Sequence, residues 1–408
     1  MEYRPRALEP LLAELLTELP ALLLVGPRAT GKTTTAGRYV TRVVRLDRPA
    51  EAAAFRSDPD AALKSIEGPV LLDEWQAVPQ VLGAVKRAVD AGAGPGRFLL
   101  TGSVRAQLDS ETWPGTGRLV RLALFGMTVR EQLDRSGPAF IDRVLGGADL
   151  EVPAVLPDLP GYIDLALRSG FPEAALSLSE RTRDRWLESY LDQLLTRDAI
   201  ELEGRRDPSK LRRYFEAFAL NSAGLAEDKT IYDAAGVNHK TAGAYEGLLR
   251  DLLITDAIPA WVSNRLKRLT KASKRYVVDP ALMATALGLD ASGVLREGDI
   301  MGRLLDTFVV AQLRPELELV RPNARLHHLR VEGGRREVDL LIEIGGERVI
   351  AIEVKSGAAP NRSDARHLVW LRDELGDRFE AGIVFHTGPN VYGLDEKVVA
   401  APICALWA

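Results

Sequence analysis

The chain has 408 residues, and its 53 Lys and Arg against 57 Asp and Glu leave a formal net charge of −4, which argues against a protein that simply coats nucleic acid or an anionic membrane. A content of 46% apolar and 27% charged residues is typical of a globular protein, and this length corresponds to about two to four domains. The single cysteine, Cys404, excludes a disulfide framework and CxxC zinc or redox motifs, and no apolar run is long enough to predict a membrane span. We therefore expect a protein of the reducing cytoplasm that has no membrane partner.

Residues 1–136 alternate between helical patterns and short apolar runs. Leucines spaced three and four residues apart predict a helix over 8–19, which Pro20 ends. The runs that predict strands are 21–25, 43–46, 70–72, 98–100 and 118–125. Unbroken apolar runs are typical of strands buried on both faces of a parallel sheet, so this part is predicted to be an α/β domain.

Residues 137–204 and 205–285 are predicted to form two further units. Helices over 163–167 and 181–200, after a stretch rich in Pro and Gly, predict a helical lid or linker. The second unit is expected to have helices over 210–220, 230–235 and 239–253, a turn at 236–238, and strands over 253–258 and 274–278. A helix-turn-helix followed by two strands is typical of a winged-helix domain.

Residues 286–408 follow another order of elements. The patterns predict a helix over 300–313, strands over 326–331, 338–343 and 349–354, a helix over 364–375 and a strand over 381–385. This segment is predicted to be a separate α/β domain. The fold class is therefore a multidomain α/β protein.

The segment Gly26 to Thr33 matches GxxxxGK[ST] at every fixed position, directly after a predicted strand and before a helix. The glycines let the backbone N–H groups face a phosphate, Lys32 neutralises the β- and γ-phosphates, and the Thr33 hydroxyl can bind Mg²⁺. The motif predicts a P-loop NTPase sheet with ATP and Mg²⁺ as cofactors. The expected ATP-binding residues are Gly26, Pro27, Arg28, Ala29, Thr30, Gly31, Lys32, Thr33 and Thr34.

Polar residues at later strand ends complete the predicted ATP site. Asp73 and Glu74 follow a buried strand; Asp73 is predicted to join Thr33 at the metal, and Glu74 to deprotonate the attacking water. Thr101 and Ser103 are candidates for a sensor of the γ-phosphate, or for an ordinary turn at a strand end. Arg118 is a candidate arginine finger, acting in cis or across a subunit boundary, and equally a candidate for a surface ion pair.

Acidic residues and a lysine converge in the last domain. Asp339 lies on one predicted strand, and Glu353 and Lys355 lie on one face of the next. This is the D…ExK arrangement of the PD-(D/E)XK nucleases, in which carboxylates hold Mg²⁺, and Asp306 on the preceding helix is a candidate additional acid. The order of elements matches that nuclease core. A catalytic site and a decayed site that keeps structural ion pairs both remain open.

Residues 205–275 hold 14 Lys and Arg against 8 acids. A local positive charge on a winged helix favours contact with DNA phosphates. The expected DNA-binding residues are His239 and Lys240 at the start of the second helix and Arg265, Lys267, Arg268, Lys271, Lys274 and Arg275 in the wing. The alternative is a protein-docking module whose charges are simply solvated.

The order of these motifs resembles one family, the AAA+ P-loop ATPases whose C-terminal half is the domain of unknown function 4143 (DUF4143). The resemblance rests on GPRATGKT, VLLDEWQAVP, FLLTGS, Gly117-Arg118, Ser189-Tyr190-Leu191, the helix-turn-helix and REVDLLIE…IAIEVKSG, which together span nearly the whole chain. It implies an ATP-binding core, a winged helix and a nuclease-like terminal domain. Where the family more usually has a glutamate, this chain has Asp306, whose shorter side chain weakens the prediction that it binds metal directly.

These observations predict an ATP-hydrolysing switch that binds DNA. An ATP-regulated, metal-dependent nuclease and a nucleotide-gated protein-interaction module with an inert nuclease fold are the alternatives. The expected partners are ATP and DNA, and assembly into a homo-oligomer is left open.

Overall fold

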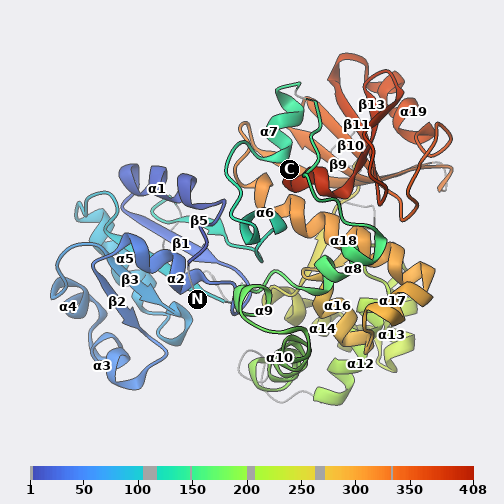
Figure 1. The fold of residues 1–408 in the computed structure, drawn as a ribbon. Coiled ribbons are helices and arrows are strands. Elements are labelled where there is room, and N and C mark those ends of the chain that lie inside the picture. Colours follow the sequence, from blue (N-terminus) through green and yellow to red (C-terminus); the bar gives the residue numbers. More distant parts are fainter. Residues whose placement is uncertain (1–2, 104–116, 148, 200–206, 262–271, 332–333) are drawn as a thin grey trace.

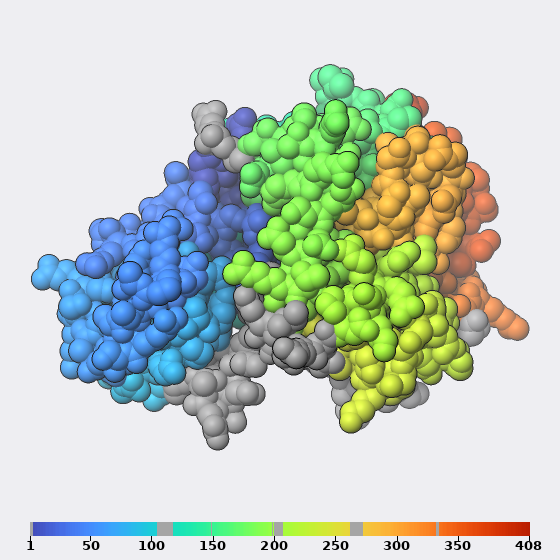
Figure 2. All heavy atoms as spheres, turned by 90° about the horizontal axis from the view of Figure 1, so that it is seen from below, coloured from blue at the N-terminus to red at the C-terminus, as the bar shows by residue number. Residues whose placement is uncertain are grey.

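The computed structural model describes residues 3–103, 117–147, 149–199, 207–261, 272–331 and 334–408. Two bodies lie side by side in Figures 1 and 2, and we call residues 3–125 the N-terminal body and residues 126–408 the C-terminal body. No helix in the described ranges is long and apolar enough to cross a membrane.

A five-stranded parallel sheet forms the centre of the N-terminal body. Its strands are β1 Ala21–Val25, β2 Arg42–Arg45, β3 Val70–Asp73, β4 Phe98–Gly102 and β5 Val120–Ala123, in the spatial order β2-β3-β4-β1-β5. The helices of this body are α1 Glu9–Glu18, α2 Lys32–Ala36, α3 Pro49–Ser57, α4 Pro59–Lys64 and α5 Val81–Asp90. Strands β1, β3 and β4 are buried along their whole length, which confirms the prediction from their apolar runs. Because the pairings are parallel, the carboxyl ends of these strands meet at one edge of the sheet.

Helices fill the first part of the C-terminal body. They are α6 Val129–Gln132, α7 Phe140–Leu145, α8 Leu159–Leu167, α9 Pro172–Leu176 and α10 Glu180–Gln193, which continues as a π-helical turn over Leu194–Asp198. The expected helices over 163–167 and 181–200 correspond to α8 and α10. The chain then enters a three-helix unit with α12 Pro208–Leu220, α13 Asp228–Ala235 and α14 His239–Asp251.

The turn between α13 and α14 has the geometry that its sequence predicts. Gly236 ends α13 with φ of 66°, a left-handed conformation that favours glycine. Asn238 begins α14 by accepting a hydrogen bond from the Thr241 N–H. An antiparallel hairpin of β6 Thr255–Ile258 and β7 Lys274–Val277 follows, and α16 Pro280–Leu287 and α17 Ala291–Arg296 lead out of the unit.

A six-stranded mixed sheet and the long helix α18 Gly298–Leu317 complete the chain. The strands are β8 Ala324–Val331, β9 Arg336–Ile344, β10 Arg348–Val354, β11 Phe379–His386, β12 Tyr392–Asp395 and β13 Val398–Pro402, with α19 Arg366–Leu375 before β11. Their spatial order is β12-β13-β11-β10-β9-β8. The predicted helix, three strands, helix and strand are present, whereas β12, β13 and the final turn Ile403–Trp407 were not predicted.

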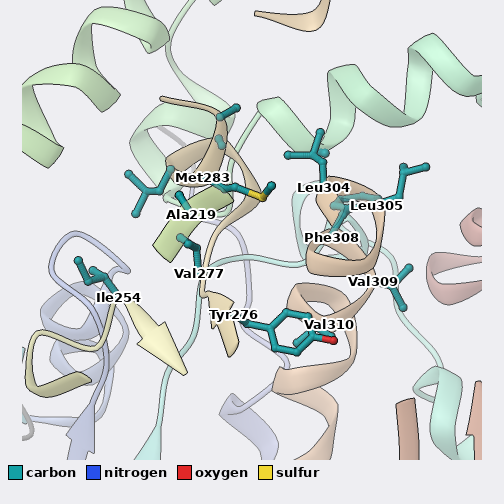
Figure 3. Packing of buried hydrophobic residues seen from close by; sticks show 14 of the residues in the cluster. Ala219, Ile254, Tyr276, Val277, Met283, Leu304, Leu305, Phe308, Val309 and Val310 are labelled. Atoms are coloured by element: carbon teal, nitrogen blue, oxygen red, sulfur yellow. The ribbon is translucent and has the colours of Figure 1, made fainter. Parts of the chain in front are cut away.

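The larger of two hydrophobic cores in the C-terminal body joins its helices to the six-stranded sheet, and a smaller core lies between that sheet and α19. The buried residues of the larger core run from Val129 to Trp407 and come from the first helices, the three-helix unit, the hairpin and one face of the six-stranded sheet. Figure 3 shows Tyr276 of β7 beside Val310 of α18, and Val277 of β7 near Ala219 of α12 and Met283 of α16. The sheet of the N-terminal body has separate cores on its two faces. The C-terminal body is therefore packed as a single unit.

Backbone hydrogen bonds also fasten the hairpin to the edge strand β8. The Trp261 N–H donates to the His328 carbonyl at 2.6 Å, and the His328 N–H donates to the Pro259 carbonyl at 3.1 Å. The His328 ring Nε2 lies 3.0 Å from the Ala272 carbonyl on the other arm of the hairpin. Because a carbonyl only accepts hydrogen bonds, Nε2 carries the proton of a neutral imidazole in this contact.

We expect acid to destabilise the fold around His328, because a charged ring is costly to bury. Burial lowers the pKa of His328 from 6.5 to about 4, so the unfolded chain takes up a proton more readily than the folded chain. The contribution of His328 is fully present above about pH 6.5 and falls by roughly 2–3 kcal/mol as the pH drops towards 4. Denaturant unfolding measured across this range checks the prediction: His328→Gln is expected to flatten the pH dependence. The exposed His239→Gln is the matched control, and equal slopes for His328→Gln and wild type would contradict the assignment.

Candidate active site

The loop that follows β1 has a backbone that requires glycine at both glycine positions of the motif. A Cβ atom at Gly26 would lie 2.0 Å from the Leu124 carbonyl oxygen, so a larger residue cannot be placed there. Gly31 has φ of 89° and precedes α2, whose first residue is Lys32. Ala29 is also left-handed, with φ of 61°, which is a strained conformation for a residue that is not glycine. The loop thus forms a tight cradle between the strand and the helix N-terminus.

Lys32 is a buried cation whose hydrogen bonds go to neutral atoms. Its Nζ donates to the Gly26 carbonyl at 2.9 Å and to the Pro27 carbonyl at 2.8 Å, inside the loop itself. Burial lowers the pKa of Lys32 to about 8, against the opposing influence of Glu74 and Asp73. The side chain therefore keeps its charge at neutral pH, and an anion in the cradle would give that charge a counterion.

Asp73 accepts hydrogen bonds from two hydroxyl groups at the edge of the sheet. The Thr33 Oγ1 donates to Asp73 Oδ1 at 2.7 Å, and the Thr101 Oγ1 donates to the same oxygen at 2.5 Å. Asp73 comes from β3, Thr101 from β4 and Thr33 from α2, so the carboxyl ends of parallel strands bring them together. A carboxylate beside a hydroxyl is a pair of hard oxygen ligands, which fits Mg²⁺.

Glu74 is held in a strained position beside this cluster. Its φ of 54° places a non-glycine residue in the left-handed region, where strain is typical of functional sites. The Ser103 hydroxyl donates to Glu74 Oε2 at 2.9 Å, and the Gln76 amide donates to the same oxygen. The two sensor candidates thus have different neighbours: Thr101 contacts Asp73 and Ser103 contacts Glu74. Gln76 was missed, although it lies only two residues beyond Glu74.

Arg118 lies away from the phosphate loop of its own chain. It precedes β5, whose last residue Ala123 pairs with Val25 at the end of β1. Arg118 precedes Ala123 by five residues of extended chain, or about 16 Å. This distance is longer than an arginine side chain, so Arg118 does not reach the phosphate loop. Its Nε donates to Asp90 Oδ1 at 2.8 Å on the surface. The prediction that Arg118 acts as an arginine finger in cis is therefore wrong. The alternative, a surface ion pair, is present. A role of Arg118 across a subunit boundary stays a prediction.

Arg6, which was not predicted as a site residue, supports the phosphate loop from outside. Its guanidinium donates to the Thr30 carbonyl at 2.8 Å, to the Phe125 carbonyl at 2.7 Å and to Glu131 at 3.1 Å. The side chain is almost fully buried. Arg6 therefore links the loop to the segment where the chain passes into the C-terminal body. No local pattern marks this role, because the partners lie 24 to 125 residues away.

The helix α10 reaches the phosphate loop from the other body. The Tyr190 hydroxyl donates to the Arg28 carbonyl at 3.2 Å. The Tyr190 ring stacks on Trp186, with centroids 5.2 Å apart, and lies 4.7 Å from Phe171. These aromatic contacts hold Tyr190 in place, so the C-terminal body contacts the loop through a rigid group.

The candidate DNA-binding residues have different surroundings. His239 and Lys240 are exposed in the first turn of α14, as expected. Arg275 is mostly buried and pairs with Asp228 and Glu246, and Lys274 is 3% exposed, so neither is available to contact DNA phosphates. The predictions for these two residues are wrong, because helix and sheet residues distant in sequence cover them. Arg265, Lys267, Arg268 and Lys271 lie outside the described residues.

The four nuclease-like residues converge where the hairpin meets the six-stranded sheet. Asp306 on α18 and Asp339 on β9 both contact Lys274, while Lys355 donates to Glu353 at 2.7 Å. Asp306, Asp339 and Lys355 line a cavity of about 430 Å³. Burial raises the pKa of Glu353 well above its usual range, Asp339 adds to this rise and Lys355 opposes it. Among the described residues, no group of three or more His, Cys, Asp or Glu is placed to hold a metal ion.

A phosphate loop on a parallel α/β sheet, with Asp73 and Glu74 at the same edge, defines a P-loop NTPase fold. Residues 18–133 match the AAA domain family, and residues 301–406 match DUF4143. Residues 18–133 are thus similar to AAA domains and residues 301–406 to DUF4143, which confirms the resemblance for these two segments. Residues 159–293 match a second domain of unknown function, DUF8612, which covers part of the predicted lid and all of the predicted winged helix.

Two curated relatives are similar to most of this chain. The uncharacterized protein Rv2008c of Mycobacterium tuberculosis and the uncharacterized protein Mb2031c of Mycobacterium bovis are each 28% identical over 94% of this chain and 80% of their own length. Among solved structures, the Walker-type ATPase Paby2304 of Pyrococcus abyssi matches 70% of this chain and 96% of its own, with a TM-score of 0.40 and 17% identity. AMPPCP-bound DnaA of Aquifex aeolicus matches 59% of this chain and 86% of its own, with a TM-score of 0.23 and 16% identity.

Proposed function

We propose that this protein hydrolyses ATP and uses turnover to move its C-terminal body relative to its N-terminal body. The observation that carries the proposal is the arrangement of Asp73 and Glu74. The Asp73 carboxylate accepts a hydrogen bond from a hydroxyl group and, with it, offers oxygen ligands that suit a metal ion. The Glu74 carboxylate lies beside it on a residue with a strained backbone conformation. A domain that only bound nucleotide would need no second carboxylate held in this way.

The residues divide the reaction between them. Lys32 and the N–H groups of the loop bind the phosphates, and Thr33 and Asp73 would hold Mg²⁺, which neutralises charge that develops on the phosphates. Glu74 accepts the proton of the attacking water, and Ser103 and Gln76 keep its carboxylate oriented. Thr101 orients Asp73 through its hydrogen bond.

The contacts between the bodies support a mechanical link. Tyr190 touches the loop directly, and Arg6 joins it to Glu131 on α6. Because one large core joins these parts of the C-terminal body, a displacement at α6 or α10 carries the three-helix unit and the DUF4143 domain with it.

We propose DNA as the partner of the three-helix unit. The support is the helix-turn-helix of α13 and α14, with His239 and Lys240 exposed where α14 begins. A helix N-terminus with exposed cations fits the phosphate backbone. Assembly into a homo-oligomer remains a prediction. Of the two alternatives, the ion pairs at Asp306, Asp339 and Glu353 favour an inert nuclease-like domain over an active nuclease.

Titration of a fluorescent DNA duplex at several salt concentrations tests the partner. Lys240→Glu is expected to weaken binding roughly tenfold, and loss of one phosphate contact is expected to lower the salt slope by about one. Lys86→Glu on α5 makes the same charge change in the N-terminal body and is the control. Equal affinity of Lys240→Glu and wild type would reject the DNA contact and leave protein docking as the role of this unit. ATP turnover, measured on the same samples, tests the ATPase proposal separately.

A further inference from the structure

Lys274 connects the hairpin to Asp306 and Asp339, and its ammonium group has a hydrogen-bond acceptor for each of its protons. Its Nζ donates to Asp306 Oδ2 at 3.1 Å, to Asp339 Oδ1 at 3.2 Å and to the Asp339 carbonyl at 3.3 Å. An ammonium has three protons to donate, and three acceptors surround it.

The remaining oxygens of the two aspartates also have partners. The Tyr276 hydroxyl, from the same strand as Lys274, donates to Asp306 Oδ1 at 3.0 Å. The Val354 N–H donates to Asp339 Oδ2 at 3.2 Å. All four carboxylate oxygens therefore have a donor from the protein, three of them from the hairpin strand β7.

The charges in this cluster depend on one another. Burial alone would lower the pKa of Lys274, but Asp306 and Asp339 outweigh it and raise that pKa well above its usual range. Without the ammonium, the buried Asp306 would lie beside the negative charge of Asp339 without a cation of its own, whereas Asp339 would keep the influence of Lys355. Asp306 therefore needs a cation between the two aspartates.

We propose that the Lys274 ammonium is the built-in cation of this acidic site, so that hairpin docking and divalent-metal binding at Asp306 and Asp339 exclude each other. The hydrogen bonds between the end of the hairpin and β8 hold Lys274 in this place. The site is thus locked in the described conformation, and a metal ion can enter only when β7 withdraws. The inference does not depend on the proposed ATPase or DNA-binding roles.

Thermal unfolding of four full-length proteins tests the lock: wild type, Lys274→Met, Asp306→Asn and the double variant. Lys274→Met keeps most of the side-chain volume and removes the charge, so its Tm is expected to fall by at least about 5 °C. Adding Asp306→Asn removes one unpaired charge and is expected to recover part of that loss. Lys229→Met is the control. It removes the same charge from an exposed ion pair, that of Lys229 with Asp233, and its Tm is expected to stay near the wild-type value.

Carboxylates bind Mn²⁺. Thermal unfolding of the same samples with Mn²⁺ therefore tests whether docking of the hairpin excludes metal binding. Mn²⁺ is expected to raise the Tm of Lys274→Met well beyond its effect on wild type, and the double variant is expected to lose this response. An equal Mn²⁺ effect on wild type and Lys274→Met would overturn the proposal, as would strictly additive Tm changes in the double variant. If Lys274→Met does not fold, recovery of folding in the double variant supports the lock, and failure to recover rejects it.

Discussion

Glu74→Gln is expected to lower ATP turnover about 10²- to 10⁴-fold while nucleotide affinity stays close to that of the wild type. Gln keeps the size of the side chain and its contact with Ser103, but it cannot accept the proton of the attacking water. Phosphate release under saturating ATP and a separate measurement of nucleotide Kd check the two halves of this prediction.

The exposed Glu67→Gln, just before β3, is the matched control and is expected to leave both quantities unchanged. Turnover of Glu74→Gln at the wild-type rate would assign the base to another residue. A parallel loss of affinity would show instead that Glu74 supports the shape of the site.

Lys32→Ala is expected to weaken ATP binding roughly 10- to 100-fold and to lower kcat/KM by about 10³-fold or more. The side chain is the buried cation of the cradle, and its hydrogen bonds to the Gly26 and Pro27 carbonyls aim it into the loop. Its removal takes away charge that acts on both the ground state and the transition state.

Equilibrium binding and steady-state turnover, with Lys86→Ala on the surface as the control, measure these losses. An unfolding curve of Lys32→Ala establishes that the variant remains folded. Wild-type turnover in Lys32→Ala would remove the phosphate loop from the mechanism.

The geometry of the candidate ATP site was largely predictable because its information is local. The spacing from Gly26 to Thr33 lies within one loop and the start of one helix. Asp73 ends a strand and Glu74 follows it, so both lie at the carboxyl edge of the parallel sheet. The sequence did not reveal that Thr33 and Thr101 share one carboxylate oxygen, since the order of strands in the sheet brings them together.

The residues that were misjudged have partners far along the chain. Lys274 occurs in a basic run, and such runs are usually exposed, but its acidic partners lie 32 and 65 residues further on. Arg6 precedes the first helix without any motif, and only the folded chain shows its contacts. Strands β12 and β13 are short and close one side of the sheet, where tertiary contacts, more than an apolar pattern, determine the structure.

The close approach of the Leu124 carbonyl to Gly26 has a thermodynamic consequence. The backbone that leads into the C-terminal body touches the phosphate loop at a point that leaves no room for a side chain, and Arg6 ties the next residue, Phe125, to Thr30. A shift of the connecting segment therefore alters the shape of the cradle. Linkage then requires reciprocity: any partner that holds the C-terminal body in one orientation changes nucleotide affinity by the same factor by which nucleotide changes the affinity for that partner.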